Sequence, residues 1–158
     1  MKLNQFYVDN LIKEAISEDI NYIDVSADYL IPDTQRNDSY FVAKADGVLC
    51  GLDIAMRVFT LLDDTFTYTV HKNDGDEVKA GDLIVEFNGK TACLLKGERT
   101  ALNYLQRMSG IATYTNSVAS LLAGTKTKER VVYVNDEPKL SECFALVSIS
   151  ITYAYVPA

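Results

Sequence analysis

The segment LLKGERTALNYLQRMSGIAT, residues 94–113, contains the side chain best suited to binding chemistry, the guanidinium of Arg99. Apolar positions that step by three, four or seven predict one long helix over about residues 98–122, which places Arg99 in its first turn. The helix dipole disfavours a cation there, and a bound anion would offset that cost. A guanidinium fork grips carboxylate or phosphate in bidentate fashion, and backbone N–H groups at a helix start add further donors. Arg99 is therefore a candidate anion-binding residue, with an exposed helix-start arginine as the alternative.

The other titratable groups give weaker signals. His71 is the only histidine of the chain and falls at a predicted strand end, which is typical of a surface or edge residue. Glu18 and Asp19 end a helical segment, where carboxylates oppose the dipole, so we weigh a structural role in the next loop against a solvated terminus. Asp63-Asp64 is typical of a turn that ends a helix. From these groups we predict no catalytic residue and no metal ligand.

A glycine-containing segment suggests a different class of protein. In DGDEVKAGDLIVEF, residues 74–87, Gly75 and Gly81 permit positive-φ turns, and Val78 between them is predicted to enter the core. This spacing resembles biotinyl/lipoyl-type β-sandwich modules, which carry a modified lysine beside a methionine at a hairpin tip. Lys72 and Lys79 lie near turns here, but neither has a methionine beside it. A structural hairpin is the better interpretation, with a carrier module as an alternative.

The elements that must position these groups follow from periodicity and turn residues. A first amphipathic helix is predicted over about residues 5–17, followed by a loop that Pro32 interrupts. Asp46-Gly47 predicts a hairpin turn between two strands, and Asn88-Gly89 predicts another turn. The remaining predicted elements are strands over 39–45, 65–72, 82–89 and 128–134, a helix over 52–62, and the long helix closed near Gly124.

Composition narrows the classes of function. The 158 residues suffice for one ordinary domain and a fragment of a second, and 48% hydrophobic with 23% charged residues is typical of a globular protein. A net charge of −7 argues against nucleic-acid binding, which needs clustered cations. Cys50, Cys93 and Cys143 are odd in number and widely spaced, which favours a reducing compartment. No signal-like segment opens the sequence and no apolar run is long enough to span a membrane, so we expect a cytoplasmic protein without a membrane partner.

Several motifs together resemble a known enzyme family. GERTALNYLQRMSGIATYT is similar to the signature of quinolinate phosphoribosyltransferase, the nicotinate-nucleotide pyrophosphorylase. The resemblance extends through AISEDI, DVS, AKADGVLCG and DGDEVKAGDLI, and covers about residues 8–125. It implies a pentosyltransferase of NAD biosynthesis that joins quinolinate to phosphoribosyl pyrophosphate, giving nicotinate mononucleotide, pyrophosphate and CO2. The family uses magnesium, whose site the resemblance does not place in this chain.

The resemblance also implies an architecture and a role for Arg99. The fold class is α+β: an N-terminal helix-and-sheet sandwich domain over residues 1–100, then the start of an incomplete α/β barrel over 101–133, namely a long helix and one strand. In this family two subunits pair, as a homodimer or within a higher oligomer, so that the N-terminal domain of one covers the barrel of the other. The arginine of the G-E-R-T motif then reaches a carboxylate of quinolinate. Arg99 occupies that position and is the predicted substrate-binding residue.

The resemblance stops near residue 133. The family usually has glycine where Asn21 stands, a minor departure, whereas Asn135 and Asp136 replace a substrate-binding basic pair. The tail 134–158 matches no family segment, and a full barrel needs about 200 residues or more. We therefore expect a fragment or a frameshifted product that is inactive alone. A non-catalytic partner subunit that supplies Arg99 to an intact homologue is the alternative from another class.

Overall fold

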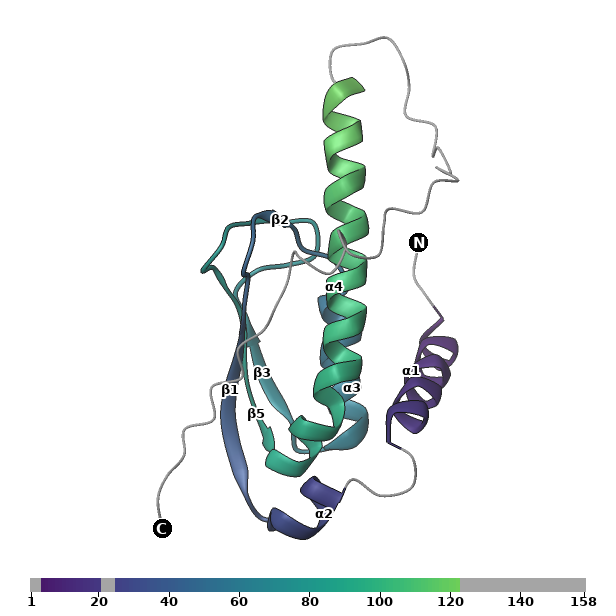
Figure 1. Cartoon of the computed structure of the whole chain (residues 1–158), viewed down its shortest axis with the longest axis vertical. Helices are drawn as coiled ribbons and strands as arrows, with labels where there is room; N and C mark the ends of the chain where they lie inside the picture. Colours follow the sequence, from purple (N-terminus) through teal and green to yellow (C-terminus); the bar gives the residue numbers. More distant parts are fainter. Residues whose placement is uncertain (1–3, 21–24, 123–158) are drawn as a thin grey trace.

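The computed structural model describes residues 4–20 and 25–122, which form helices and two small antiparallel sheets (Figure 1). The first half contains α1 (Gln5–Asp19), α2 (Val25–Leu30), β1 (Arg36–Val42), β2 (Gly47–Val48) and α3 (Leu52–Leu62). The second half contains β3 (Thr67–Val70), β4 (Glu77–Val78), β5 (Leu83–Lys90) and α4 (Thr91–Leu122). The predicted α+β class, with a sheet domain followed by a long helix, is confirmed.

The core lies between the sheet and helices α3 and α4. Strands β1, β5 and β3 form one antiparallel sheet in that order, and β2 pairs with β4 in a second, smaller one. Four phenylalanines join the layers: the ring centroids of Phe59 and Phe87 lie 5.4 Å apart, and those of Phe41 and Phe87 lie 4.8 Å apart. Phe66 stacks on Phe59 at 5.3 Å. Burial of these large rings is a main source of stability for a domain of this size.

The hairpin predicted at Asp46-Gly47 does not form. The chain after β1 does not return along β1 but pairs with residues 75–82. Ala43 N donates to Asp82 O at 2.9 Å, and Gly75 N donates to Leu49 O at 2.8 Å. The positive-φ turns predicted at Gly75 and Gly81 are confirmed, each with φ of +95°, and Val78 is buried between them as predicted. Distant backbone pairing therefore overrides the local turn signal.

The turn predicted at Asn88-Gly89 is also wrong. Asn88 is inside β5, opposite Asp38 on β1 and Thr67 on β3. Gly89 is closely packed, since a Cβ there would lie 3.0 Å from a ring carbon of Phe66. The strand then continues to Lys90 and passes directly into α4. The loop predicted around residues 21–33 contains the short helix α2.

Helix α4 crosses the domain boundary predicted between residues 100 and 101, and the helix is continuous there. Residues beyond α4 lie outside the described part of the chain. They include the end of the segment 101–133, the predicted strand over 128–134 and the tail 134–158. The domain division stays a prediction. Among the described residues, no helix combines the length and apolar character needed to cross a lipid bilayer.

Candidate substrate-binding surface on helix α4

Arg99 does not lie at a helix start. Helix α4 begins at Thr91, immediately after β5, so Arg99 falls in its third turn. Thr91 N donates to Gln35 O at 2.9 Å, and Leu94 is fully buried. Packing against the sheet therefore lets the helix begin at Thr91, before the start at about residue 98 that the sequence pattern predicts. The backbone N–H groups around Arg99 are already inside the helix ladder. The argument that the helix terminus assists anion binding is therefore wrong, and any anion at Arg99 is bound by the side chain.

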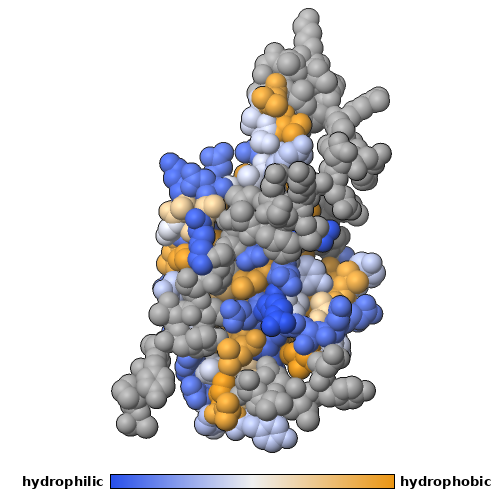
Figure 2. All heavy atoms as spheres, viewed as in Figure 1, coloured by the Kyte–Doolittle hydropathy of each residue, from blue (hydrophilic) through white to orange (hydrophobic). Residues whose placement is uncertain are grey.

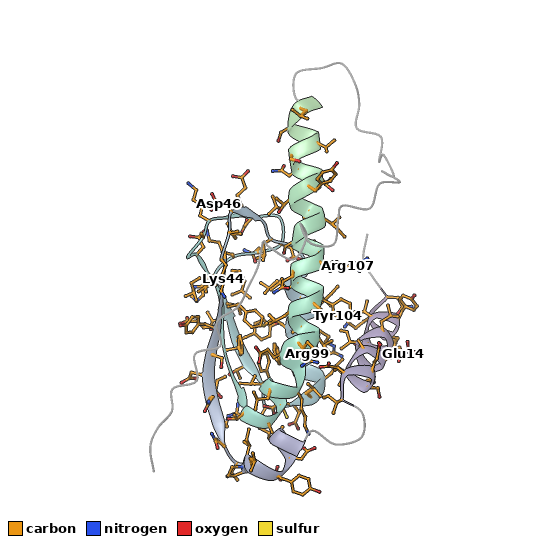
Figure 3. All side chains as sticks on the ribbon, in the orientation of Figure 1. Glu14, Lys44, Asp46, Arg99, Tyr104 and Arg107 are labelled. Atoms are coloured by element: carbon orange, nitrogen blue, oxygen red, sulfur yellow. The ribbon has the colours of Figure 1, made fainter. Side chains whose placement is uncertain are left out.

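The guanidinium of Arg99 is held by the end of helix α1. Its Nη1 donates to Oδ1 of Asp19 at 2.9 Å. The arginine side chain keeps 76% of its accessible surface, whereas the aspartate side chain keeps 24%. Figure 3 shows Arg99 on the side of α4 that faces α1. The cation is thus anchored at one nitrogen and presented to solvent.

Further polar side chains continue along the same stripe of α4. Asn103 and Arg107 follow Arg99 at successive four-residue steps, which keeps them on one helix face. A hollow of about 370 Å³ lies between α1 and α4. It is lined by Ala15, Glu18, Asp19, Thr100, Asn103, Tyr104 and Arg107. Figure 2 shows this side of the molecule as a mixed surface, with hydrophilic residues between hydrophobic ones.

Helix α1, which carries Asp19, is held on the domain by apolar side chains and by an ion pair with α3 in addition to the Asp19–Arg99 pair. Ile12 is 1% exposed and belongs to the core. Asp9 accepts two hydrogen bonds from Arg57 of α3, at 2.8 Å from Nε and 2.7 Å from Nη2. These bonds, with one from Gln5, lower the pKa of Asp9 to about 2. The bidentate geometry fixes the rotation of α1 as well as its position.

Acid should weaken this docking. The folded pKa of Asp9 lies below the ordinary value, so its contribution to stability is present above about pH 4 and is lost as the pH falls toward 2. We expect amide hydrogen-exchange protection in α1 to decrease over this window in the unmodified chain. In Asp9→Asn the protection should be lower already at pH 7 and should change less with acid. An identical pH profile in the two proteins would contradict the role of this pair.

Two other residues of the G-E-R-T region have structural roles. A Cβ on Gly97 would lie 3.0 Å from atoms of Leu62 and Phe59, so the glycine permits close packing of α4 on α3. Lys96 forms an ion pair with Asp28 of α2. In the segment 96–99, Gly97 therefore packs toward the core, Lys96 pairs with α2, and Arg99 pairs with α1.

The remaining sequence candidates lie away from this surface. His71 Nε2 is 2.8 Å from Glu86 Oε2 at an exposed edge of the sheet, as predicted for a surface residue. Lys72, considered for a carrier module, pairs with Asp82 at 3.0 Å. The described residues contain no cluster of three or more His, Cys, Asp or Glu side chains that could hold a metal ion.

Sequence reasoning missed the importance of Asp63. It lies at the C-terminal end of α3 as predicted, but its side chain is only 1% exposed. Its Oδ1 accepts from the backbone and hydroxyl of Thr65, and its Oδ2 accepts from the backbone of Lys90 at 2.8 Å. Asp63 therefore joins the end of α3 to the junction between β5 and α4.

Comparison with known proteins identifies the family. The family model "Quinolinate phosphoribosyl transferase, N-terminal domain" matches residues 24–109, more than half of the chain. The chain belongs to this family. The matched segment includes Arg99 and Arg107, whereas Asp9 and Asp19 of α1 precede it.

Individual relatives agree with this assignment. The probable nicotinate-nucleotide pyrophosphorylase [carboxylating] of Bacillus subtilis is 35% identical over 126 residues, which is 80% of this chain and 43% of the relative. A mitochondrial quinolinate phosphoribosyltransferase [decarboxylating] of Nicotiana tabacum is 37% identical over 69% of the chain and 31% of its own length. The crystal structure of NadC from Streptococcus pyogenes has a TM-score of 0.76 and 36% identity, covering 81% of this chain and 46% of that one.

The chain spans less than half of the length of these relatives. The shared part is the N-terminal sheet domain with its long helix, which agrees with the fold described above. The comparisons thus support the quinolinate phosphoribosyltransferase interpretation over the carrier-module alternative.

Proposed function

We propose that this chain provides the N-terminal domain of a quinolinate phosphoribosyltransferase, and that Arg99 binds a carboxylate of quinolinate in the barrel of a partner subunit. The complete enzyme would join quinolinate to phosphoribosyl pyrophosphate, releasing pyrophosphate and CO2, in NAD biosynthesis. The observation that carries this proposal is the solvent-presented guanidinium of Arg99 inside the segment that matches the family.

The chemistry of Arg99 suits this role. A guanidinium is a cation that offers several N–H donors in one plane, which matches a carboxylate. The ion pair with Asp19 uses Nη1 only. A side chain this exposed has no ligand-enclosing walls of its own, so the rest of the substrate pocket must come from another surface. We therefore propose a homodimer or a higher oligomer in which the Arg99 face of α4 meets a partner barrel.

A hybrid enzyme tests the role of Arg99. The corresponding N-terminal segment of the Bacillus subtilis relative is replaced by residues 1–122 of this chain, and initial rates are measured against both substrates. Arg99→Gln should raise the KM for quinolinate roughly 10- to 100-fold, because a hydrogen-bonded charge pair contributes about 1.5–3 kcal/mol. The KM for phosphoribosyl pyrophosphate should change little.

Arg107→Gln is the matched control, since it removes an exposed arginine from the same stripe of α4. It should leave the KM for quinolinate within about twofold, the range of an exposed side chain without a substrate contact. Equal effects of the two substitutions would contradict a specific role for Arg99.

We also expect the full chain alone to form no nicotinate mononucleotide from quinolinate, phosphoribosyl pyrophosphate and magnesium. Measurable product would overturn the need for a partner barrel.

A further inference from the structure

We propose that Asp19 is a positioning residue, which holds the Arg99 guanidinium in the orientation that binds the quinolinate carboxylate. This inference rests on the function proposed above and extends it to helix α1. Asp19 itself touches no substrate in this scheme. It acts through its single hydrogen bond to Arg99 Nη1.

The difference in exposure between the two partners gives the direction of the effect. The Asp19 side chain keeps 24% of its accessible surface and the Arg99 side chain keeps 76%. The carboxylate is therefore the more enclosed group, and the guanidinium is the group that reaches outward from it. A long arginine side chain loses considerable rotamer entropy when it binds a ligand, and a fixed carboxylate reduces that loss in advance.

Helix α1 makes Asp19 a fixed point. Asp19 is the last residue of the helix, and the amide of the following residue, Ile20, donates to Ile16 O at 2.9 Å. Farther back, Asp9 holds Arg57 in bidentate fashion, and Ile12 is buried in the core. The position of the carboxylate is thus set by contacts along one face of α1, an ionic one to α3 and an apolar one to the core.

The electrostatic setting favours a cation at this place. A carboxylate at the C-terminal end of a helix faces the negative end of the dipole. The Arg99 guanidinium offsets both the aspartate charge and the dipole. Glu18 lies beside Asp19 on the same helix end, yet no hydrogen bond or ion pair joins its side chain to another of the described residues. Of the two neighbouring acids, Asp19 alone is paired with the binding residue.

The bond leaves the arginine able to bind substrate. Asp19 occupies Nη1, and a guanidinium presents further N–H groups on Nη2 and Nε for a second carboxylate. Arg99 can therefore contact the aspartate and the ligand together. Loss of Asp19 should weaken quinolinate binding without changing the chemical step.

Two measurements test the inference. In the full chain labelled at arginine nitrogen, NMR reports how fast the Arg99 guanidinium rotates, and Asp19→Asn should increase that rate about two- to fivefold, the size of an exposed ion pair. In the hybrid enzyme, Asp19→Asn should raise the KM for quinolinate about two- to fivefold with kcat unchanged. Glu14→Gln, at an exposed glutamate of α1 outside the lining of the hollow, is the control and should change neither value. The double variant Asp19→Asn/Arg99→Gln should have the KM of Arg99→Gln alone.

The outcomes separate the two proposals. If Arg99→Gln raises the KM and Asp19→Asn leaves it unchanged or lowers it, the positioning role is overturned and the proposed function stands. If Arg99→Gln leaves the KM unchanged, the proposed function fails and the present inference fails with it. A rotation rate that Asp19→Asn does not alter would also overturn the positioning role, and it needs no enzyme activity to be read.

Discussion

Asp63→Ala should lower the free energy of unfolding by about 3–4 kcal/mol, because it removes a buried charged acceptor and leaves two backbone N–H groups without a partner. Those groups belong to Thr65, at 2.9 Å from Oδ1, and to Lys90, at 2.8 Å from Oδ2. The Thr65 hydroxyl also donates to Oδ1 at 2.6 Å. The midpoint and slope of urea unfolding, followed by circular dichroism, measure the loss.

Asp64→Ala is the matched control, since Asp64 is the exposed neighbour of the same residue type. It should change the unfolding free energy by no more than about 0.5 kcal/mol, the usual range for a surface substitution. Asp63→Asn should give an intermediate loss because the amide keeps one acceptor oxygen. Equal losses for Asp63→Ala and Asp64→Ala would show that the hydrogen bonds of Asp63 do not contribute to the free energy of unfolding.

The Asp63 network also has a pH signature. Burial raises the pKa of this carboxyl, but the hydrogen bonds from Thr65 and Lys90, with the nearby charge of Arg36, outweigh burial and leave it below its ordinary value. A lowered folded pKa means that this stabilisation is complete above about pH 4 and is lost as the pH falls through the folded pKa. Asp63→Asn should therefore flatten the acid side of the stability profile.

Elements with a strong periodic pattern were predictable from the sequence. Helices α1 and α3 begin and end within about two residues of the predicted bounds, and β5 within one. In each case one face packs on the core, as with Ile12 on α1 and Phe59 on α3. The apolar residues that give the periodic pattern are the same residues that pack on the core. Local sequence and tertiary packing therefore favour the same element, which makes these elements predictable.

Features set by distant partners were not predictable. Asp46-Gly47 and Asn88-Gly89 are both good hairpin signals, yet the first is followed by pairing with residues 75–82 and the second lies inside β5. No property of Asp63-Asp64 as a dipeptide tells which carboxylate is buried. That choice depends on Lys90 and Arg36, which lie 27 residues from it along the chain in both directions.

The role of Arg99 in substrate binding stays a prediction, and the argument that placed Arg99 at a helix start was wrong. The sequence pattern places Arg99 and the acidic pair Glu18-Asp19 at predicted helix ends, where the helix dipole disfavours a charge of that sign. For Arg99 the end was misplaced, because α4 begins at Thr91. For Asp19 the end is real, and its compensating cation is Arg99 itself. The arginine and the acidic helix end therefore belong to one contact between α1 and α4.

Gly51→Ala should lower the free energy of unfolding by about 2–4 kcal/mol, since backbone strain and overpacking act together. Gly51 precedes α3 with φ of +92°, and its N–H donates to Asp74 Oδ2 at 2.9 Å. A Cβ there would lie 2.7 Å from Met108 Sδ and 3.2 Å from Met108 Cβ. The sulfur can rotate away, but the Cβ of Met108 is fixed to α4, so the helix itself would have to move.

Gly81→Ala separates the two causes. Gly81 has nearly the same φ, +95°, with no atom within 4 Å of its added Cβ, so only the strain of about 1–2 kcal/mol should appear. Met108→Ala should recover part of the Gly51→Ala loss when the two are combined. Equal losses at Gly51 and Gly81 would contradict the packing argument. A larger loss at Gly51 would show that the close approach between the start of α3 and α4 fixes the helix that carries Arg99. At the same place Cys50 N donates to Ser109 Oγ at 3.0 Å.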